Sequence, residues 1–206
     1  MTIKNIFTII IFSLFITACS VNQMENQPVL AKKKVLLERE AISNELLNDI
    51  NHILFLLKQK DLETLNSRFI HPTFGYFELS KDENQKRIII QQKFLMDEIN
   101  DDIESFDIKE EEVIFNCSPY DDSYYGWNKE GVFLLPSKTL YLSELMKQEN
   151  LIKIDSYSQK DIEKAVFMDK GSYEITIPYN IIFYLTKIDK QWYITLIDKV
   201  KTDCSE

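Results

Sequence analysis

The chain has 206 residues, and its content of 45% hydrophobic and 12% aromatic residues excludes a disordered protein. It carries 24 Lys and Arg residues against 33 Asp and Glu residues, so that its formal net charge is −9. An acidic surface repels phosphate groups, so we expect no nucleic-acid partner and no direct binding to anionic lipid headgroups.

The first 18 residues have the pattern of an export signal. Lys4 supplies a positive charge, and an almost wholly apolar run follows at residues 6–16. A helix of that length is too short to span a bilayer, so the pattern predicts a signal peptide over residues 1–18. The run ends in Ile-Thr-Ala-Cys, which resembles the lipobox of bacterial lipoproteins. The resemblance implies that Cys19 is lipidated and becomes the first residue of the mature chain. The alternative is an ordinary cleaved signal peptide, in which the cysteine at position 19 is a coincidence and carries no lipid.

Lipid on Cys19 implies a location in the cell envelope. Several acyl chains hold a protein stably at a membrane, whereas one chain holds it only marginally. Ser20 after the cysteine resembles lipoproteins that are sorted to the outer membrane, so we expect an anchored protein that faces the periplasm. Residues 19–28 show no apolar periodicity and are predicted to form a lipidated tether. A single α+β domain is predicted to follow at residues 29–206.

Helices are predicted in the first part of this domain. Apolar residues recur every three or four positions over residues 29–59, which predicts one long amphipathic helix. Asp61 is in position to cap a short second helix, and Pro72 is expected to stop it. Residues 73–79 are predicted to form a strand. Residues 84–99 fit either a helix or a strand, and we predict a helix.

Strands dominate the predicted second half. Val113, Phe115 and Cys117 alternate, which predicts a strand with Cys117 pointing inward. Ser158-x-x-Asp161 resembles the start of a capped helix. Pro178 is expected at a bulge or edge of the first of two long closing strands. The prediction places strands at 112–118, 132–135, 172–187 and 191–199, and helices at 137–148 and 158–168.

Two parts of this pattern resemble nuclear transport factor 2-like proteins and the related cystatin-like-fold lipoproteins. One is residues 56–65 (LLKQKDLETL) with the Phe-Ile-His-Pro of residues 69–72, and the other is residues 181–197, in which Trp192 follows a turn. The resemblance implies a long N-terminal helix packed on a curved antiparallel sheet, and a C-terminal β-hairpin. In that family the sheet forms a cone whose open end can hold a small molecule. Some members are isomerases or dehydratases and many have no known activity, so the fold does not settle function.

The cysteines predict one disulfide. Cys117 and Cys204 remain once Cys19 is assigned to lipid, and a pair of cysteines in an exported protein normally oxidises. The alternative is two free buried thiols. The two histidines are far apart and no paired Cys or His spacing occurs, so we expect no metal site and no cofactor.

Catalytic candidates are few. In a cone cavity His71 and Tyr76, with Asp121 or Asp122, would serve an enzyme of isomerase or hydrolase type. The alternative for His71 is a hydrogen-bonding role near the surface, and the alternative for the two aspartates is a role in a turn.

The best candidate for ligand binding is an aromatic loop at residues 119–131. Tyrosine and tryptophan in a loop present large, rigid contact areas, and they either bind a ligand or pack back onto the domain. We therefore expect a non-catalytic envelope lipoprotein that binds a protein, a glycan or a small ligand, with an enzyme and a structural spacer as the alternatives. The ring side chains of this loop are Tyr120, Tyr124, Tyr125 and Trp127.

Overall fold

The computed structural model describes residues 42–82, 85–95, 99, 103–118, 125–137, 142–153 and 156–204. All of them belong to one compact unit, residues 36–206. The predicted signal peptide, Cys19, the tether and residues 29–41 of the predicted long helix lie outside the described residues, as do Tyr120, Asp121, Asp122 and Tyr124.

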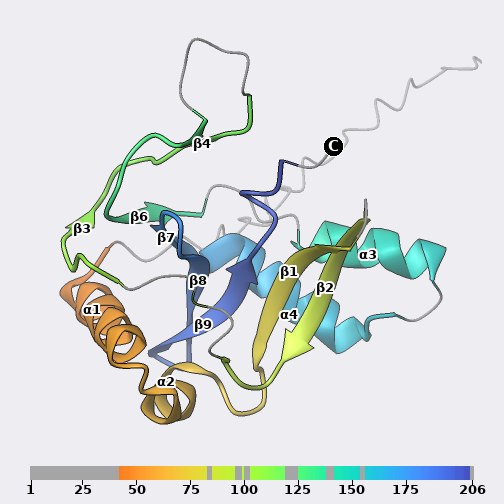
Figure 1. The fold of residues 1–206 in the computed structure, drawn as a ribbon. Helices are drawn as coiled ribbons and strands as arrows, with labels where there is room; N and C mark the ends of the chain where they lie inside the picture. Colours follow the sequence, from red (N-terminus) through yellow and green to blue (C-terminus); the bar gives the residue numbers. More distant parts are fainter. Residues whose placement is uncertain are drawn as a thin grey trace, which may run out of the picture. The chain divides into compact units, whose positions relative to one another are not determined.

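A mixed sheet is the centre of this unit (Figure 1). Its strands are β1 (Tyr76–Asp82), β2 (Gln85–Gln91), β3 (Ile108–Lys109), β6 (Val132–Pro136), β7 (Tyr173–Ile177), β8 (Ile181–Ile188) and β9 (Gln191–Asp198). They are arranged in the order β2-β1-β9-β8-β7-β6-β3. The pairs β1–β9 and β3–β6 are parallel, and the other neighbours are antiparallel. A separate antiparallel pair joins β4 (Phe115–Asn116) to β5 (Gly126–Trp127).

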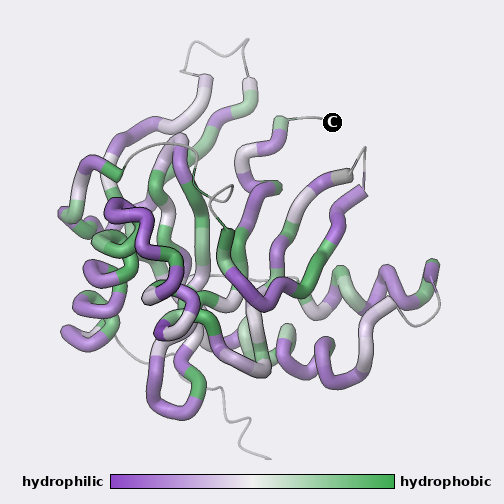
Figure 2. Tube along the Cα trace, turned by 60° about the horizontal axis from the view of Figure 1, so that its bottom comes forward, coloured by the Kyte–Doolittle hydropathy of each residue, from purple (hydrophilic) through white to green (hydrophobic). Residues whose placement is uncertain are grey.

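Two pairs of helices cover opposite faces of the sheet. Successive side chains of a strand point to opposite faces, so a strand that is covered on both sides is apolar throughout. In β8, Phe183 packs in the core that contains α1 and α2, whereas Tyr184 packs in the core that contains α3 and α4. Figure 2 shows the resulting hydrophobic segments in the central strands. The helices are α1 (Asn44–Gln59), α2 (Leu62–Phe69), α3 (Leu142–Ile152) and α4 (Gln159–Gly171).

Side-chain caps begin three of these helices. The Ser43 side chain accepts the N–H of Leu46, and because Ser43 is extended, α1 starts only at Asn44. The predicted helix over residues 29–59 is thus confirmed only from Asn44 onward. Asp61 caps α2 as predicted, accepting hydrogen bonds from the N–H and the hydroxyl of Thr64 at 3.1 and 2.7 Å. Ser158 caps α4 as predicted.

The prediction of a helix over residues 84–99 is wrong. Residues 85–91 form β2, which pairs with β1 along its whole length, and Leu79 lies opposite Ile88. Three consecutive isoleucines at 88–90 suit a strand because branched side chains pack well on a pleated surface. Pairing with β1 therefore decides between two patterns that the local sequence allows equally.

Two further predictions are corrected in the second half. The predicted strand over residues 172–187 is two strands, because Pro178 opens a turn in which the Asn180 N–H donates to the Ile177 carbonyl at 3.0 Å. Proline has no N–H for a sheet and its fixed φ suits that turn position. Cys117 is exposed, not inward, because the predicted strand shrinks to Phe115–Asn116 and ends before the cysteine.

The α+β class and the C-terminal hairpin are confirmed. The hairpin β8–β9 turns at Asp189 and Lys190, both of which have positive φ. The strand predicted at residues 132–135 corresponds to β6, and the predicted strand at 73–79 and helices at 137–148 and 158–168 correspond to β1, α3 and α4 with shifted ends. Within the described ranges, no helix is both long enough and apolar enough to cross a membrane.

Candidate ligand-binding cavity

A cavity of about 470 Å³ lies where β7 turns into β8 and where β9 ends. Its walls come from the β4–β5 pair, from the β7–β8 turn, and from the C-terminal segment, residues 199–204, that follows β9. Small-molecule sites have volumes of about 300–1,000 Å³ and combine apolar walls with a few polar groups. The aromatic, polar and charged residues of this cavity are Phe115, Trp127, Tyr179, Asn180, Asp198, Lys199 and Thr202.

Tyr179 has the most unusual backbone in this cavity. Its φ of +63° lies in the left-handed region, which a bulky side chain rarely adopts. It stands at the third position of the turn from Ile177 to Asn180, where a positive φ favours glycine or asparagine. Its side chain is nevertheless 56% exposed. Such backbone strain costs roughly 1–3 kcal/mol and clusters at binding and catalytic sites.

The other two rings belong to the β4–β5 pair. Phe115 and Trp127 meet edge to face, with ring centroids 5.2 Å apart. Gly126 has a φ of +98°, and a Cβ atom on it would lie 3.4 Å from the Tyr179 hydroxyl. Glycine thus allows the β5 backbone to come close to the turn. As a result, three aromatic side chains from separate segments border one hollow.

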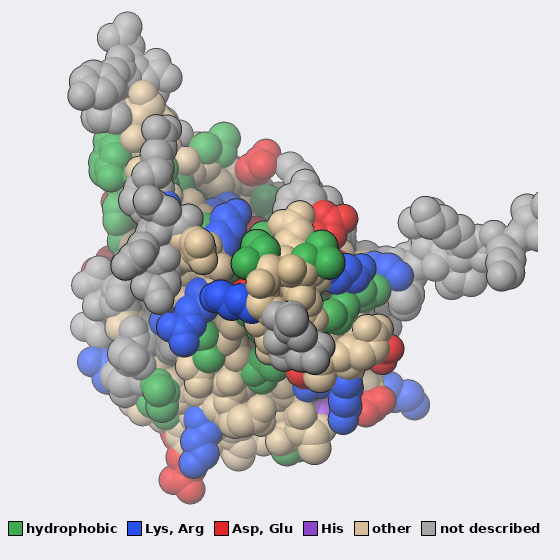
Figure 3. Space-filling model, turned by 90° about the vertical axis from the view of Figure 1, so that its right-hand side faces the viewer, with side chains coloured by type: hydrophobic (Ala, Val, Ile, Leu, Met, Phe, Trp, Pro, Cys, Tyr) green, Lys and Arg blue, Asp and Glu red, His purple; other side chains and the backbone are tan. Residues whose placement is uncertain are grey.

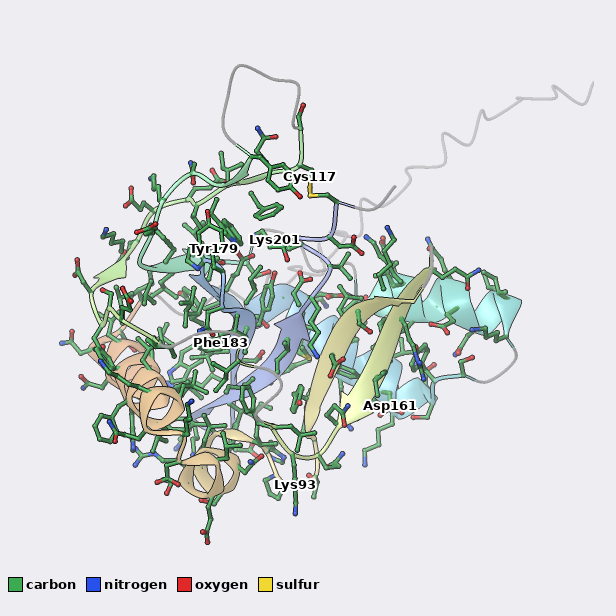
Figure 4. All side chains as sticks on the ribbon, viewed as in Figure 1. Lys93, Cys117, Asp161, Tyr179, Phe183 and Lys201 are labelled. Atoms are coloured by element: carbon green, nitrogen blue, oxygen red, sulfur yellow. A yellow bond between two sulfur atoms is a disulfide. The ribbon has the colours of Figure 1, made fainter. Side chains whose placement is uncertain are left out.

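The predicted Cys117–Cys204 disulfide is present and joins two walls of the cavity. The Cα atoms of the two cysteines are 5.3 Å apart. Phe115 and Thr202, each two residues from a bonded cysteine, both line the cavity. Figure 4 shows Cys117 at the same end of the sheet as Tyr179, whereas Lys93 lies at the opposite end. The bond therefore fixes the C-terminal segment beside the β4–β5 pair.

Asp198 is the acidic group of the cavity. Its Oδ1 atom accepts the N–H groups of Val200 and Lys201 at 2.8 and 3.0 Å. Burial raises the pKa of Asp198, and the charge of Glu174 acts in the same direction, while the two N–H donors oppose them. Asp198 also lines two neighbouring hollows of about 510 and 390 Å³.

The two lysines beside Asp198 are engaged by other carboxylates. Lys199 Nζ lies 3.2 Å from the nearly buried carboxylate of Glu78. Lys201 pairs with Glu174, which also accepts the Tyr184 hydroxyl at 2.9 Å. Burial raises the pKa of Tyr184, and the charge of Glu174 adds to this effect. These ion pairs hold the C-terminal segment onto the sheet. Figure 3 shows one face of the molecule, on which basic and acidic side chains are interspersed.

His71 and Tyr76 lie away from the aromatic cavity and make separate contacts. His71 Nδ1 accepts the N–H of Phe74 at 3.1 Å, and its ring lies 4.9 Å from that of Tyr193. Tyr76 is fully buried and donates its hydroxyl to the Lys93 carbonyl at 3.3 Å. Neither residue lines the cavity.

The two described members of the aromatic loop differ in position. Tyr125 is 62% exposed, and its ring lies 6.2 Å from that of Phe115. Trp127 is almost wholly buried and lines the cavity. Trp127 therefore both packs against the domain and forms a wall of the hollow.

Sequence reasoning missed Phe115, Tyr179 and Asp198 as cavity residues. Tyr179 had a local signal, because Pro178 and Asn180 flank an aromatic residue where a turn expects glycine or asparagine. Phe115 and Asp198 had none, since each is an ordinary member of a strand pattern. In the part of the chain that the structure describes, no group of three or more His, Cys, Asp or Glu residues could hold a metal ion.

Comparisons of the chain with protein-family models, with curated proteins and with solved structures gave no match. Function is therefore inferred from the cavity and from the sequence.

Proposed function

We propose that this chain is an envelope lipoprotein whose α+β unit binds a small ligand in the aromatic cavity without catalysing a reaction on it. The observation that carries the proposal is the exposed, strained Tyr179 at the cavity. Glycine at this turn position would relieve the strain, so the ring must contribute something that glycine cannot. Contact with a bound molecule is such a contribution.

The walls of the cavity suit binding. Phe115, Trp127 and Tyr179 offer large apolar areas, while Asp198 and Thr202 offer polar groups that can orient a ligand. The disulfide and the ion pairs of the C-terminal segment restrain one wall before a ligand arrives. A site that is ordered in advance loses less entropy on binding.

The membrane anchor is a separate part of the proposal and is supported by the sequence alone. Lipid on Cys19 would hold the protein at a membrane, most simply the outer membrane on its periplasmic side, with residues 19–28 as a tether. An oxidising compartment also suits the Cys117–Cys204 bond. The test is the intact mass of the protein purified from its own membranes. A multiply acylated chain that begins at Cys19 is expected, and an unmodified chain would contradict the anchor.

We also propose that the sheet of this unit is curved into a cone like that of nuclear transport factor 2-like proteins. Two features support this: α1 and α2 lead into β1, and the chain closes with the β8–β9 hairpin. The pair α3 and α4, inserted between β6 and β7, covers the other face of the sheet and goes beyond what the resemblance implies. An experimental structure that lacked a curved sheet with α1 in its hollow would contradict the cone.

Ligand binding can be tested with the two tryptophans. The full chain in detergent, labelled with ¹⁵N-tryptophan, gives one indole signal from Trp127 in the cavity wall and one from Trp192 in the core. A Trp127→Phe variant assigns them. We expect some members of a mixture of neutral, cationic and anionic fragments to shift the Trp127 signal and to leave Trp192 unchanged. A mixture in which no compound shifts Trp127 would contradict the proposal.

Matched variants identify the site. Tyr179→Gly should remove the fragment-induced shifts while keeping stability unchanged or raising it by up to about 1 kcal/mol, because glycine relieves the strain. Tyr125→Ala removes an equally exposed tyrosine that does not line the cavity, and it should keep the shifts. His71→Ala should keep them too. If only His71→Ala abolished the function of the protein in cells, an isomerase or hydrolase would be the better explanation.

A further inference from the structure

The electrostatics of the aromatic cavity indicate the charge of its ligand. Four carboxylates gather around the C-terminal segment, those of Asp198, Asp203, Glu78 and Glu174, against the three ammonium groups of Lys81, Lys199 and Lys201. Lys199 also lines the cavity, but its ammonium group pairs with Glu78. Lys201 pairs with Glu174 and Lys81 with Asp203, so Asp198 is the carboxylate of this group that forms none of these ion pairs. The chain as a whole is also strongly acidic, so its field attracts cations and repels anions.

The rings beside Asp198 favour the same sign of charge. The face of an aromatic ring carries partial negative charge and attracts a cation that lies within about 6 Å of its centroid. Phe115, Trp127 and Tyr179 supply three such rings in one hollow of about 470 Å³. An arrangement of several rings is a recognised way to bind an alkylated ammonium group. The Asp198 carboxylate adds a negative charge beside these rings. A cationic ligand would add a counter-charge to this partly buried carboxylate, which otherwise has the charge of Lys201 and two backbone N–H donors.

We infer that the aromatic cavity takes a small organic cation, an alkylammonium group held between the Trp127 and Tyr179 rings and the Asp198 carboxylate. This inference rests on the proposed binding function and adds the chemical class of the ligand. The positive charge compensates Asp198, and the alkyl groups contact the rings. No covalent step is involved.

A matched set of probes tests the inference. Choline carries a quaternary ammonium group, 3,3-dimethylbutan-1-ol has carbon in place of the charged nitrogen at nearly the same size and shape, and 3,3-dimethylbutanoate is an anion of similar size. Titration of the full chain, followed through the Trp127 indole signal, should show choline binding about tenfold more tightly than the alcohol. The anion should bind more weakly than both.

Variants assign the selectivity to the carboxylate. Asp198→Asn should lower the affinity for choline about tenfold by removing the Coulomb attraction to its quaternary nitrogen, while leaving the alcohol unchanged. Asp49→Asn is the control: it removes one negative charge from α1, away from the cavity, and should leave both affinities unchanged. Tyr179→Gly should weaken choline and the alcohol together. Because the Asp198 hydrogen bonds come from backbone N–H groups, asparagine can still accept them through its carbonyl.

The affinity for choline should also depend on pH. Choline does not titrate, so its affinity should fall as the pH is lowered through the raised pKa of Asp198, while the affinity for the alcohol stays constant. The charged or titratable groups that face Asp198 are Glu174 on β7, Tyr184 on β8 and Lys201 in the C-terminal segment. The Asp198→Asn variant should lose this pH dependence.

The outcomes separate the inference from the proposed function. If fragments bind in the cavity but choline binds no better than the alcohol or the anion, the inference is overturned and the binding function stands. If neither the fragments nor the three probes shift the Trp127 signal, both are overturned. Tighter binding of choline that depends on Asp198 supports both.

Discussion

Loss of the Cys117–Cys204 disulfide should lower stability strongly. The two cysteines are 87 residues apart, and a cross-link of that length removes roughly 4–5 kcal/mol of loop-closure free energy from the unfolded chain. We expect Cys117→Ser/Cys204→Ser to lower the free energy of unfolding by about that amount. Because the Cys117 side chain is exposed, serine leaves no cavity there. For a unit of this size the melting temperature should fall by roughly 8–20 °C.

Urea unfolding followed by circular dichroism measures this effect. The comparison needs three samples that all carry Cys19→Ala, so that no third thiol is present: the oxidised protein, the same protein in reductant, and the double serine variant. The reduced protein and the variant should coincide. Their dependence on urea should be steeper than that of the oxidised protein, because an unfolded chain without the cross-link exposes more surface. A loss of less than about 1 kcal/mol in the variant would refute the reasoning.

Three further predictions concern the scaffold. Gly75→Ala should lower the free energy of unfolding by more than about 2 kcal/mol, because the φ of Gly75 is +64° and a Cβ atom there would lie 2.1 Å from the Gln91 carbonyl oxygen. Gly171→Ala is the control: a Cβ atom at Gly171 would have nothing within 4 Å, so the same urea assay should show no loss of stability. Ser158→Ala should cost about 1 kcal/mol by removing the cap of α4, and Ser158→Thr, which keeps the hydroxyl that donates to Asp161, should restore it. Burial raises the pKa of Asp169, so the folded state binds a proton more tightly than the unfolded state, and this contribution to stability is lost as the pH rises through the raised pKa. The difference in unfolding free energy between wild type and Asp169→Asn should therefore change only between the ordinary pKa of an aspartate in the unfolded chain and the raised pKa in the folded protein. A difference that stays constant with pH would contradict a raised pKa of Asp169.

Features that depend on neighbouring residues could be predicted from the sequence. Asp61 and Ser158 mark helix starts because a side-chain oxygen can reach the N–H group of a residue three positions further on. The closing hairpin follows from two apolar runs on either side of Asp189 and Lys190. The α+β class follows from the change of periodicity along the chain.

The disulfide was also predictable from the sequence, though for a different reason. With Cys19 assigned to lipid, only one pairing of cysteines is possible. The prediction of the disulfide needed no geometry. The separate prediction that Cys117 points inward from a strand was wrong, because the strand ends at Asn116 and Cys117 is exposed. Whether a side chain is buried depends on what packs against the strand, and alternation over a few residues does not contain that information.

The pairing of segments and the contacts between distant residues follow from the tertiary structure and not from local sequence. The isoleucine run in β2 suits a helix or a strand, and pairing with β1 selects the strand. The cavity brings together Phe115 and Trp127 of the β4–β5 pair, Tyr179 of the β7–β8 turn and Asp198 at the end of β9. Their proximity results from the order of the strands and from the disulfide. Local propensity acts over a few residues, whereas a binding cavity is made by contacts between distant ones. This is why Phe115 and Asp198 could not be identified before the fold was known, although the aromatic loop pointed to Trp127.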